Sequence, residues 1–482
     1  MGTDGGTWLA VGHAVVAVML SLEILLNKYR PVSAAFWLGL VWMFPIWGAL
    51  GFLVFGLDRA RSVWAVQEHH QALSERHSAL LEPGTERSVA PDRPAASAMP
   101  IPAGHIFRAT EPAVQPFRVT PGNAVDLLVD GDRLYPALLD AIESAEHFVY
   151  VQSYIIAPDV AGGRLLAALE RRARDGLTIR VLYDRFGSAH AAFTGIFRQV
   201  RDAGVLVRPA RAWGRVNLRN HRKVAIIDGR TAFVGGMNID DRNVTGGRRV
   251  APDRDYHARI RGPVTRDLQL QFLTDWAASG RESVEDMLAL EDFPEVPDAG
   301  RALVQVVAGG PYRSGSGLSK AYFAAIASGS ESVTVVTPYF LPDEAIFAAL
   351  RFAALRGARV RVIVPATSNH WYTAYAARAQ YAPLLRSGIR IFERRPPFMH
   401  AKALVVDGVY AMIGSANLNY RSLHLNFELN IEVAEPDFVA ALERQVEDEI
   451  RHSDEVSLEA HEARPVTVRL TENLCRLFQP VL

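Results

Sequence analysis

Two segments of the chain repeat the same polar pattern. HRKVAIIDG begins at His221 and HAKALVVDG begins at His400, and both read His, any residue, Lys, four residues, Asp, Gly. Flanking segments repeat as well, since FVYVQSYII, which contains Tyr154, resembles SVTVVTPYFL, which contains Tyr339. The offset is 185 residues for the tyrosines and 179 for the histidines. Offsets that agree to within a few residues indicate a duplicated domain with small insertions.

Helical and strand patterns alternate within each half. The first half reads as a helix at RLYPALLDAIESA, a strand at HFVYVQSYII, a helix at GRLLAALERRARDG and a strand at TIRVLYD, and the second half repeats this order. Such alternation predicts an α/β fold with largely parallel sheets flanked by helices. We therefore expect two pseudo-repeated domains, at residues 117–295 and 296–482.

The repeated motif is predicted to lie on a strand in each half. KVAIIDGRTAFVGG and KALVVDGVYAMIGS are apolar on both sides of an Asp-Gly turn. Side chains two residues apart on a strand point to the same face, which would place His221 beside Lys223 and His400 beside Lys402. A histidine next to a cation suits a phosphate site.

These residue types predict phosphoryl transfer with one histidine on each side of the phosphorus. A neutral imidazole can attack phosphorus while a second, protonated imidazole gives its proton to the leaving alcohol. Lys223 and Lys402 supply positive charge for the non-bridging oxygens, which in other enzymes comes from a metal. Asn238 in GGMN and Asn417 in GSAN are candidate substrate-binding residues, because their small neighbours let an amide approach an anion.

The N-terminal region is apolar enough to enter a membrane. Val32 to Leu57 runs without a charge and is long enough to cross about 30 Å of hydrocarbon. Gly5 to Leu22 is also uncharged but is followed by Glu23, which makes it the weaker span or a re-entrant partner. We expect residues 1–58 to form a membrane anchor of one or two transmembrane helices, with a pair of buried core helices as the alternative.

Basic residues beside the apolar segments leave the topology open. Arg59 and Arg61 favour a cytoplasmic location for the C-terminal side of the second segment, whereas Lys28 and Arg30 favour the same location for the connection between the segments. A simple hairpin cannot satisfy both. We expect catalytic domains on the cytoplasmic side of the inner membrane, with a single-pass or multi-pass anchor.

Two polar segments are predicted to lie outside the cores. Residues 59–116 read as a helix and then a tether, because Glu82–Gly104 is rich in Pro, Ala and Ser. GRRVAPDRD, which contains Arg254, is a charge run that reads as a solvated loop whose arginines are candidates for contact with lipid headgroups.

Composition excludes several classes of function. Lys and Arg together number 52, as do Asp and Glu, so the chain lacks the basic excess of most nucleic-acid-binding proteins. The single cysteine, Cys475, can form neither an internal disulfide nor a cysteine-based metal site. We expect no nucleic-acid partner, no metal and no other cofactor.

The duplicated motif with its downstream Gly-Gly/Ser-x-Asn resembles that of the phospholipase D superfamily, and both copies are intact. The N-terminal apolar pair and the segments TPYFLPDE, RDYHARIRGP and SANLNYRSLHLNFELN resemble those of bacterial cardiolipin synthases over nearly the whole chain. The resemblance implies a membrane-anchored phosphatidyltransferase. Such an enzyme condenses two phosphatidylglycerol molecules into cardiolipin and releases glycerol, without nucleotide or metal.

The resemblance also implies a role for each histidine. One forms a phosphatidyl-histidine intermediate, and the other protonates the departing glycerol and later activates the incoming alcohol. We expect His221 to be the nucleophile and His400 the acid/base, with the reverse assignment left open. Asp255 and Glu428 match the carboxylates that orient the family's histidines.

Four further residues are placed by the same resemblance or by their type. Asp228 and Asp407 match the family's motif aspartates and belong to the candidate catalytic set, although such aspartates are more often structural than chemical. Tyr154 and Tyr339 read as packing residues at strand ends, and we place them outside the site.

Three other functions stay open. A phospholipase D-type hydrolase or transphosphatidylase would give the same intermediate to water or to another alcohol. A phosphodiesterase acting on nucleic acid is disfavoured by the apolar segment and by the zero net charge. A non-enzymatic membrane scaffold would be inactive on phosphatidylglycerol. The preferred acceptor alcohol and the oligomeric state do not follow from the sequence.

Overall fold

The computed structural model of the chain describes residues 4–28, 31–56, 101–111, 117–210, 218–247, 251–280, 293–311 and 317–479. It divides into two compact units, residues 1–65 with 212–218 and residues 66–211 with 219–482. The first unit holds the N-terminal helices, and the second holds every strand that is described.

The long apolar helix of the first unit is α1 (Asp4–Asn27). Its stretch Ala10–Asn27 is the one described segment that is long and apolar enough, as a continuous helix, to cross a membrane. Gly5–Leu22, predicted as the weaker span, falls within this helix. The continuous apolar helix therefore lies in the segment that was predicted as the weaker span.

The second apolar region is broken into three helices: α2 (Pro31–Met43), α3 (Pro45–Gly51) and the π-helix η1 (Phe52–Gly56). Pro45 has no amide hydrogen and begins α3, while Phe44 before it is extended. The uncharged sequence correctly indicated the length of the apolar region, but it did not indicate that the region is divided into three helices.

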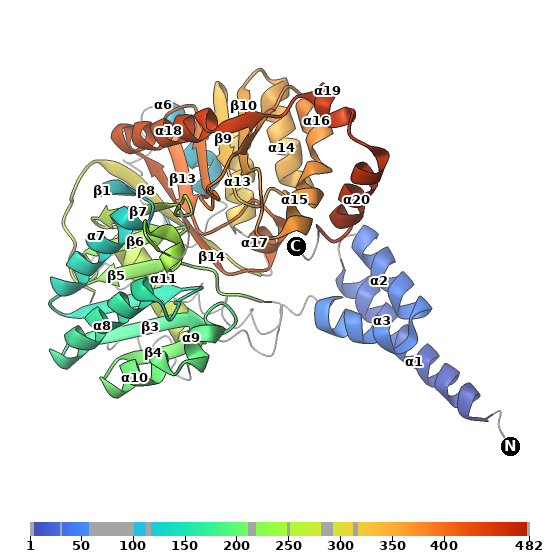
Figure 1. Ribbon diagram of the computed structural model, residues 1–482, viewed down its shortest axis with the longest axis horizontal. Coiled ribbons are helices and arrows are strands. Elements are labelled where there is room, and N and C mark those ends of the chain that lie inside the picture. The colour runs from blue at the N-terminus through green and yellow to red at the C-terminus, as the bar shows by residue number, and fades with distance from the viewer. Residues whose placement is uncertain are drawn as a thin grey trace, which may run out of the picture. The chain divides into compact units, whose positions relative to one another are not determined.

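All the described strands form one continuous mixed sheet (Figure 1). The strands are β1 (Thr120–Val129), β2 (Phe148–Ser153), β3 (Thr178–Asp184), β4 (Leu206–Ala210), β5 (Val224–Ile227), β6 (Thr231–Gly235), β7 (Tyr256–Arg261), β8 (Ala302–Gly309), β9 (Ser332–Val336), β10 (Arg359–Pro365), β11 (Arg390–Arg394), β12 (Ala403–Val406), β13 (Tyr410–Gly414), β14 (Glu428–Ala434) and β15 (Ser453–Glu455).

The order of the strands reveals the duplication. It runs β15-β11-β10-β9-β12-β13-β14-β8-β1-β7-β6-β5-β2-β3-β4, and the two halves of the sheet meet where β8 pairs with β1. Counted outward from this pair, the first half (β1–β7) and the second half (β8–β14) place equivalent strands in the same order, and β15 extends one edge. The predicted pair of pseudo-repeated domains is confirmed.

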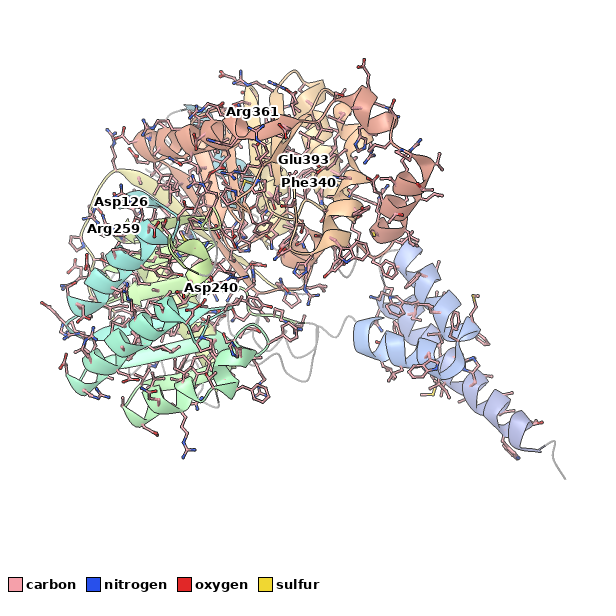
Figure 2. The ribbon with its side chains drawn as sticks, viewed as in Figure 1. Asp126, Asp240, Arg259, Phe340, Arg361 and Glu393 are labelled. Carbon is pink, nitrogen blue, oxygen red and sulfur yellow. The ribbon has the colours of Figure 1, made fainter. Side chains whose placement is uncertain are left out.

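The sheet is mixed rather than largely parallel. Among the described strands, only β2, β3 and β4 in the first half and β9, β10 and β11 in the second pair in parallel. The remaining pairs are antiparallel, including the hairpins β5–β6 and β12–β13 and the β1–β7 pair, where Asp126 faces Arg259 (Figure 2). Alternating helices and strands revealed the parallel strands, but a hairpin needs no crossover helix.

Helices cover both faces of the sheet. On one face α11 (Thr265–Ala278) and α18 (Pro436–Arg451) cover a single core that draws apolar residues, such as Phe272 and Leu442, from both halves. On the other face each half has its own core. Its helices are α7 (Gly131–Glu143), α8 (Val160–Arg174) and α10 (Ile196–Asp202) in the first half, and α13 (Gly317–Ser328), α14 (Glu344–Leu355) and α16 (Tyr381–Leu385) in the second.

Helix α6 (Ile101–Thr110) takes the place of the end of the predicted tether. Ile106 and Phe107 are buried in the core of the second half, and the Thr110 hydroxyl donates a 2.8 Å hydrogen bond to Glu432 in β14. The segment therefore packs, although its Pro/Ala-rich composition predicts a tether. The preceding residues 59–100 lie outside the described residues.

Candidate active site

The histidine and lysine of each repeated motif lie immediately before the central hairpin of its half, and the motif aspartate lies in the turn of that hairpin. The strands β5 and β12 begin at Val224 and Ala403, so the predicted placement of the motif histidines and lysines on these strands is wrong. The segments are instead fixed by backbone hydrogen bonds to the other half. His221 N–H donates to the Phe427 carbonyl at 2.9 Å, and His400 N–H donates to the Arg254 carbonyl at 2.7 Å.

Each motif histidine contacts a carboxylate that belongs to the other half of the catalytic unit. Nδ1 of His221 in the first half lies 2.9 Å from Oε2 of Glu428 in the second, and Nδ1 of His400 lies 2.7 Å from Oδ2 of Asp255 in the first. Both carboxylates are fully buried, whereas the histidine side chains are 12% and 17% exposed. No described residue is shown hydrogen-bonding Nε2 of either ring, so each Nε2 is available to a substrate.

Glu428 is held as an anion. Burial alone would raise its pKa, but the nearby His221, Lys223 and a 2.6 Å hydrogen bond from the Ser415 hydroxyl hold the pKa of Glu428 below its usual value. Burial also lowers the pKa of His221, and Glu428 offsets this only in part. The pair therefore consists of a carboxylate and a neutral imidazole whose Nδ1–H donates to it.

The other pair is arranged differently. Nζ of each lysine donates to the carbonyl of its own histidine, at 2.6 Å for Lys223. Nζ of Lys402 also lies 2.8 Å from Nδ1 of His400 and 3.9 Å from Oδ2 of Asp255. Burial, followed by the charges of Lys402 and Lys223, lowers the pKa of His400 well below its usual value. Burial raises the pKa of Asp255 against the effect of Lys402.

Both motif lysines are buried, at 2% and 1% exposure. Burial lowers the pKa of Lys223 to about 7, partly offset by Glu428, and lowers that of Lys402 to about 8, partly offset by Asp255. The charge of Lys402 also lowers the pKa of Lys223, and the charge of His221 lowers that of His400. The two motifs thus form one electrostatic cluster that is suited to an added anion.

The small residues before each asparagine make room for the histidine's carboxylate partner. A Cβ on Gly236 would meet Oδ1 of Asp255 at 2.2 Å, so only glycine fits at that position. The equivalent residue in the second half is Ser415, which donates to Glu428. The sequence predicted that the small residues let a substrate anion approach here. The anions that lie against Gly236 and Ser415 are the carboxylates of Asp255 and Glu428.

The two candidate substrate-binding asparagines are nearly buried. Oδ1 of Asn238 accepts a hydrogen bond from Ile155 N–H at 3.3 Å, and Nδ2 of Asn417 donates to the Ser422 hydroxyl at 3.3 Å. Oδ1 of Asn417 has no hydrogen-bond partner among the described residues. Asn417 therefore retains hydrogen-bonding capacity that its own environment does not use.

The motif aspartates are not part of this cluster, so the structure does not support the catalytic role assigned to them. Asp228 follows the far end of β5 and accepts hydrogen bonds of 2.8 Å from the N–H groups of Glu146, His147 and Phe148. Asp407 binds the N–H groups of residues 330–332 in the same way. Both aspartates have left-handed φ values, 51° and 52°, and close the turn of a hairpin.

Tyr154 is nearer the site than its predicted packing role implied. Its ring centroid lies 5.0 Å from that of His221, and Nζ of Lys223 lies 5.5 Å from it. The equivalent Tyr339 donates a 2.6 Å hydrogen bond to Asn369, and burial raises its pKa to about 12. Tyr154 and Tyr339 occupy equivalent positions in the two repeats, and this equivalence could have indicated that they lie near the motif histidines.

Two arginines also differ from expectation or were missed. Arg242 donates to Asp240 from Nε at 2.9 Å, and the charge of Arg242 lowers the pKa of His400. Arg254, a candidate for lipid headgroups, is largely buried and pairs instead with Asp130 and Glu449. Arg254 thus joins the halves.

Comparison with known proteins gives consistent matches. The family model described as "Cardiolipin synthase, PLD-like domain" matches residues 138–276 and 322–450. A cardiolipin synthase of Geobacillus kaustophilus is 33% identical, covering 96% of this chain and 92% of the relative, and cardiolipin synthase A of Pseudomonas putida is 35% identical, covering 97% and 96%. The crystal structure of a phosphatidylserine synthase from Haemophilus influenzae matches 78% of this chain and 100% of its own, with a TM-score of 0.62 at 16% identity, and shares the fold.

Proposed function

The chain belongs to the cardiolipin synthases with phospholipase D-like domains, and from this membership we propose that it joins two phosphatidylglycerol molecules through a phosphatidyl-histidine intermediate. It is a phosphatidyltransferase, and its products are cardiolipin and glycerol. One phosphodiester is exchanged for another, so the transfer needs no activated nucleotide.

The observation that carries the proposed mechanism is that each histidine is held by a carboxylate of the other half. Nδ1 of each imidazole forms a hydrogen bond with a buried carboxylate of the other half. Among the described residues, none is given as a hydrogen-bond partner of either Nε2. An in-line displacement needs a nucleophile on one side of phosphorus and a proton donor on the other. Two imidazoles held in this way supply both.

In the first step Nε2 of His221 attacks the phosphorus of one phosphatidylglycerol. The bond from phosphorus to the glycerol oxygen breaks, and the proton on Nε2 of His400 passes to that oxygen, so glycerol leaves as a neutral alcohol. The phosphatidyl group is then bound to His221, and His400 is neutral.

In the second step the free hydroxyl of a second phosphatidylglycerol attacks the phosphatidyl-histidine. His400 takes the proton of that hydroxyl, the nitrogen–phosphorus bond breaks, and cardiolipin is released. His221 returns to its neutral form and His400 to its protonated form. The cycle therefore closes without net consumption of a proton.

The differing environments of the histidines support this assignment of roles. Glu428 stays ionised and His221 stays neutral, which suits a nucleophile. His400 has a pKa well below its usual value, because burial and the charges of two lysines disfavour its cation. A bound phosphodiester offsets those charges and raises the pKa of His400, so the imidazolium forms when its proton is needed.

The lysines and asparagines are assigned to the phosphate. Lys223 and Lys402, which are both buried, neutralise the charge of the non-bridging oxygens and so stabilise the transition state. Asn238 and Asn417 add amide donors through Nδ2, and Nδ2 of Asn417 has a second hydrogen besides the one that it gives to Ser422. Membrane association follows from family membership, and we place the catalytic domains on the cytoplasmic side of the inner membrane.

A product analysis tests the function. With phosphatidylglycerol as sole lipid, we expect cardiolipin and glycerol in a one-to-one ratio, little phosphatidic acid, and no effect of a chelator. An acid quench should trap a phosphatidyl adduct on His221, and the His221→Ala variant is the control that should form none. Phosphatidic acid as the main product would identify a hydrolase instead.

A further inference from the structure

Helix α20 (Val466–Arg476) presents a stripe of large apolar side chains to solvent. The apolar stripe comprises five residues that are 55% to 75% exposed: Val466, Leu470, Leu474, Leu477 and Phe478. Val466, Leu470, Leu474 and Leu477 recur at intervals of three or four residues, and Phe478 is four residues after Leu474, so the five lie on one side. Large apolar side chains gathered in this way mark a surface that meets an apolar partner.

The opposite side of α20 is fixed to the protein. Glu472 and Cys475 are buried, and Glu472 pairs with Arg464, which precedes the helix. Beyond the last turn, Nε2 of Gln479 donates a hydrogen bond to the Pro342 carbonyl at 2.7 Å. The helix is thus held at both ends with its apolar stripe turned outward.

Two arginines lie beside the apolar stripe. Arg469 and Arg476 are both exposed, and at 100° per residue they fall between the buried side of the helix and the stripe. An amphipathic helix with apolar residues on one side and arginines at the border is suited to the interface of an anionic membrane. The arginines can reach lipid phosphates while the stripe lies at the acyl boundary.

The position of α20 links this surface to the active site. Gln479 binds the carbonyls of Leu341 and Pro342, and Leu341 N–H donates to the Leu418 carbonyl at 2.9 Å. Leu418 directly follows Asn417 of the site. A membrane held against α20 would therefore be connected to a substrate-binding loop through a short series of hydrogen bonds.

We propose that α20 docks the second half of the catalytic unit onto an anionic lipid bilayer, with its apolar stripe inserted at the headgroup boundary. A second copy of the chain fits less well, because 11 residues span only about 16 Å and one helix side offers far less than the roughly 800 Å² that each partner of a stable dimer buries. The inference concerns how the protein meets its substrate surface and does not depend on the chemical steps.

Site-directed labelling of the full-length protein in vesicles tests the docking. Cys475→Ala removes the only native thiol, and Leu474→Cys then carries an environment-sensitive fluorophore on the stripe. The matched control is Leu355→Cys on α14, whose side chain is 73% exposed on another helix. In vesicles containing phosphatidylglycerol, we expect blue-shifted emission and quenching by bromolipids at position 474, and neither at position 355.

Charge variants give the second arm of the test. Arg469→Gln and Arg476→Gln should each lower the ratio of docked to undocked label about fivefold in anionic vesicles, and should have no effect in zwitterionic vesicles. An unshifted label at position 474 in anionic vesicles would overturn the proposal. So would a shift that depends on protein density rather than on lipid charge, which would indicate a second copy. Neither readout requires turnover, so failure here is distinct from failure of the proposed reaction.

Discussion

At the scale of single residues, the two histidines differ in the surroundings of Nδ1. Among the described residues, Glu428 is the one partner given for Nδ1 of His221, whereas Asp255 and Lys402 both lie within 2.8 Å of Nδ1 of His400. Either histidine-to-alanine change should lower synthase activity by several orders of magnitude, and the double variant should be no worse, because the two act as one unit. Steady-state kinetics of the three variants measures this. Substantial activity in both single variants would contradict the composite site.

A substrate with a good leaving group separates the two roles. With a phosphatidyl ester of p-nitrophenol, the leaving group needs no proton, so His400→Ala should release about one equivalent of nitrophenolate and retain an adduct on His221. His221→Ala should show no burst. Stopped-flow absorbance measures the burst, and a burst in His221→Ala alone would exchange the two roles.

Glu428→Gln tests the carboxylate that orients the nucleophile. Burial lowers the pKa of His221 and Glu428 raises it, so loss of that charge lowers the pKa further. Activity requires neutral His221 and is lost as pH falls through its pKa, so the acid limb of kcat/KM should move to lower pH. We expect kcat to fall roughly 100-fold. Asp255→Asn is the matched variant, and an equal movement of the acid limb in both would contradict the assignment.

Lys223→Arg tests the need for charge at the phosphate. Burial lowers the pKa of Lys223 to about 7, so its charge is present below that pH and is lost as pH rises through it. An arginine keeps its charge at these pH values, so the alkaline limb of kcat/KM should move to higher pH in the variant. This shift is expected even if the maximum of kcat/KM also changes. An unmoved limb in a pH–rate comparison would show that the lysine's charge does not matter.

The residues of the site were predicted from sequence more fully than their partners were. The repeat pointed to the histidines, lysines and asparagines, because their spacing is local and duplicated. The exchange of Glu428 and Asp255 between halves depends on how the two repeats pack, and spacing along a chain does not report that. Tyr154 was missed for a related reason, since an aromatic residue at a strand end has no local sign of what it faces.

At the scale of elements, the motif aspartates hold the hairpins that carry the site. Asp407 accepts hydrogen bonds from three consecutive N–H groups, and these lower its pKa although burial raises it. Asp407→Asn should lower the free energy of unfolding by about 1–3 kcal/mol with little change in kcat. Asparagine tolerates the left-handed φ of 52°, so the loss reports the charge rather than backbone strain.

The pH dependence of that loss has a definite sign. The folded-state pKa of Asp407 lies below its unfolded value, so its stabilisation is present above the unfolded pKa and is lost as pH falls through the folded one. The difference between wild type and Asp407→Asn in thermal unfolding should therefore shrink in acid. Asp228→Asn is the matched variant in the first half, and a large drop in kcat for either would return these aspartates to the catalytic set.

Element types were predicted better than their connections. Helical and strand periodicity is local and recovered the helix–strand order of both halves, whereas the two hairpins changed the sheet from largely parallel to mixed. The break at Pro45 and the packing of α6 were missed because apolar or Pro-rich composition averages over residues. One proline or a few buried side chains decide the outcome in both places.

At the scale of the whole catalytic unit, Arg222 ties the two halves together. It is fully buried, it pairs with Asp275 in the first half, and it donates to the carbonyls of Glu428 and Gly309 in the second at 3.0 and 3.1 Å. One core on one face of the sheet also includes residues of both halves. The halves should therefore unfold in a single transition.

Arg222→Gln is expected to lower the free energy of unfolding by about 3–5 kcal/mol, because it leaves Asp275 with an uncompensated buried charge. The double variant Arg222→Met with Asp275→Asn, which removes both charges, should lose less. Calorimetry of the detergent-solubilised protein measures both effects. Two separate transitions, with only one moved by the substitution, would show that the halves fold independently.

Because each histidine is held by a carboxylate of the other half, the two histidines can acquire different roles in the course of evolution. In two identical subunits related by a twofold axis, both histidines would have the same surroundings and the same proton affinity, and neither would be committed to attack or to proton donation. Fusing the copies into one chain breaks that symmetry. Lys402 can then lie 2.8 Å from Nδ1 of its imidazole in addition to donating to the carbonyl of His400, and the described contacts of Lys223 with His221 include only the carbonyl. Division of labour between chemically identical side chains can thus be encoded in the duplicated gene, whereas in a symmetric dimer it would arise only when an asymmetric substrate binds.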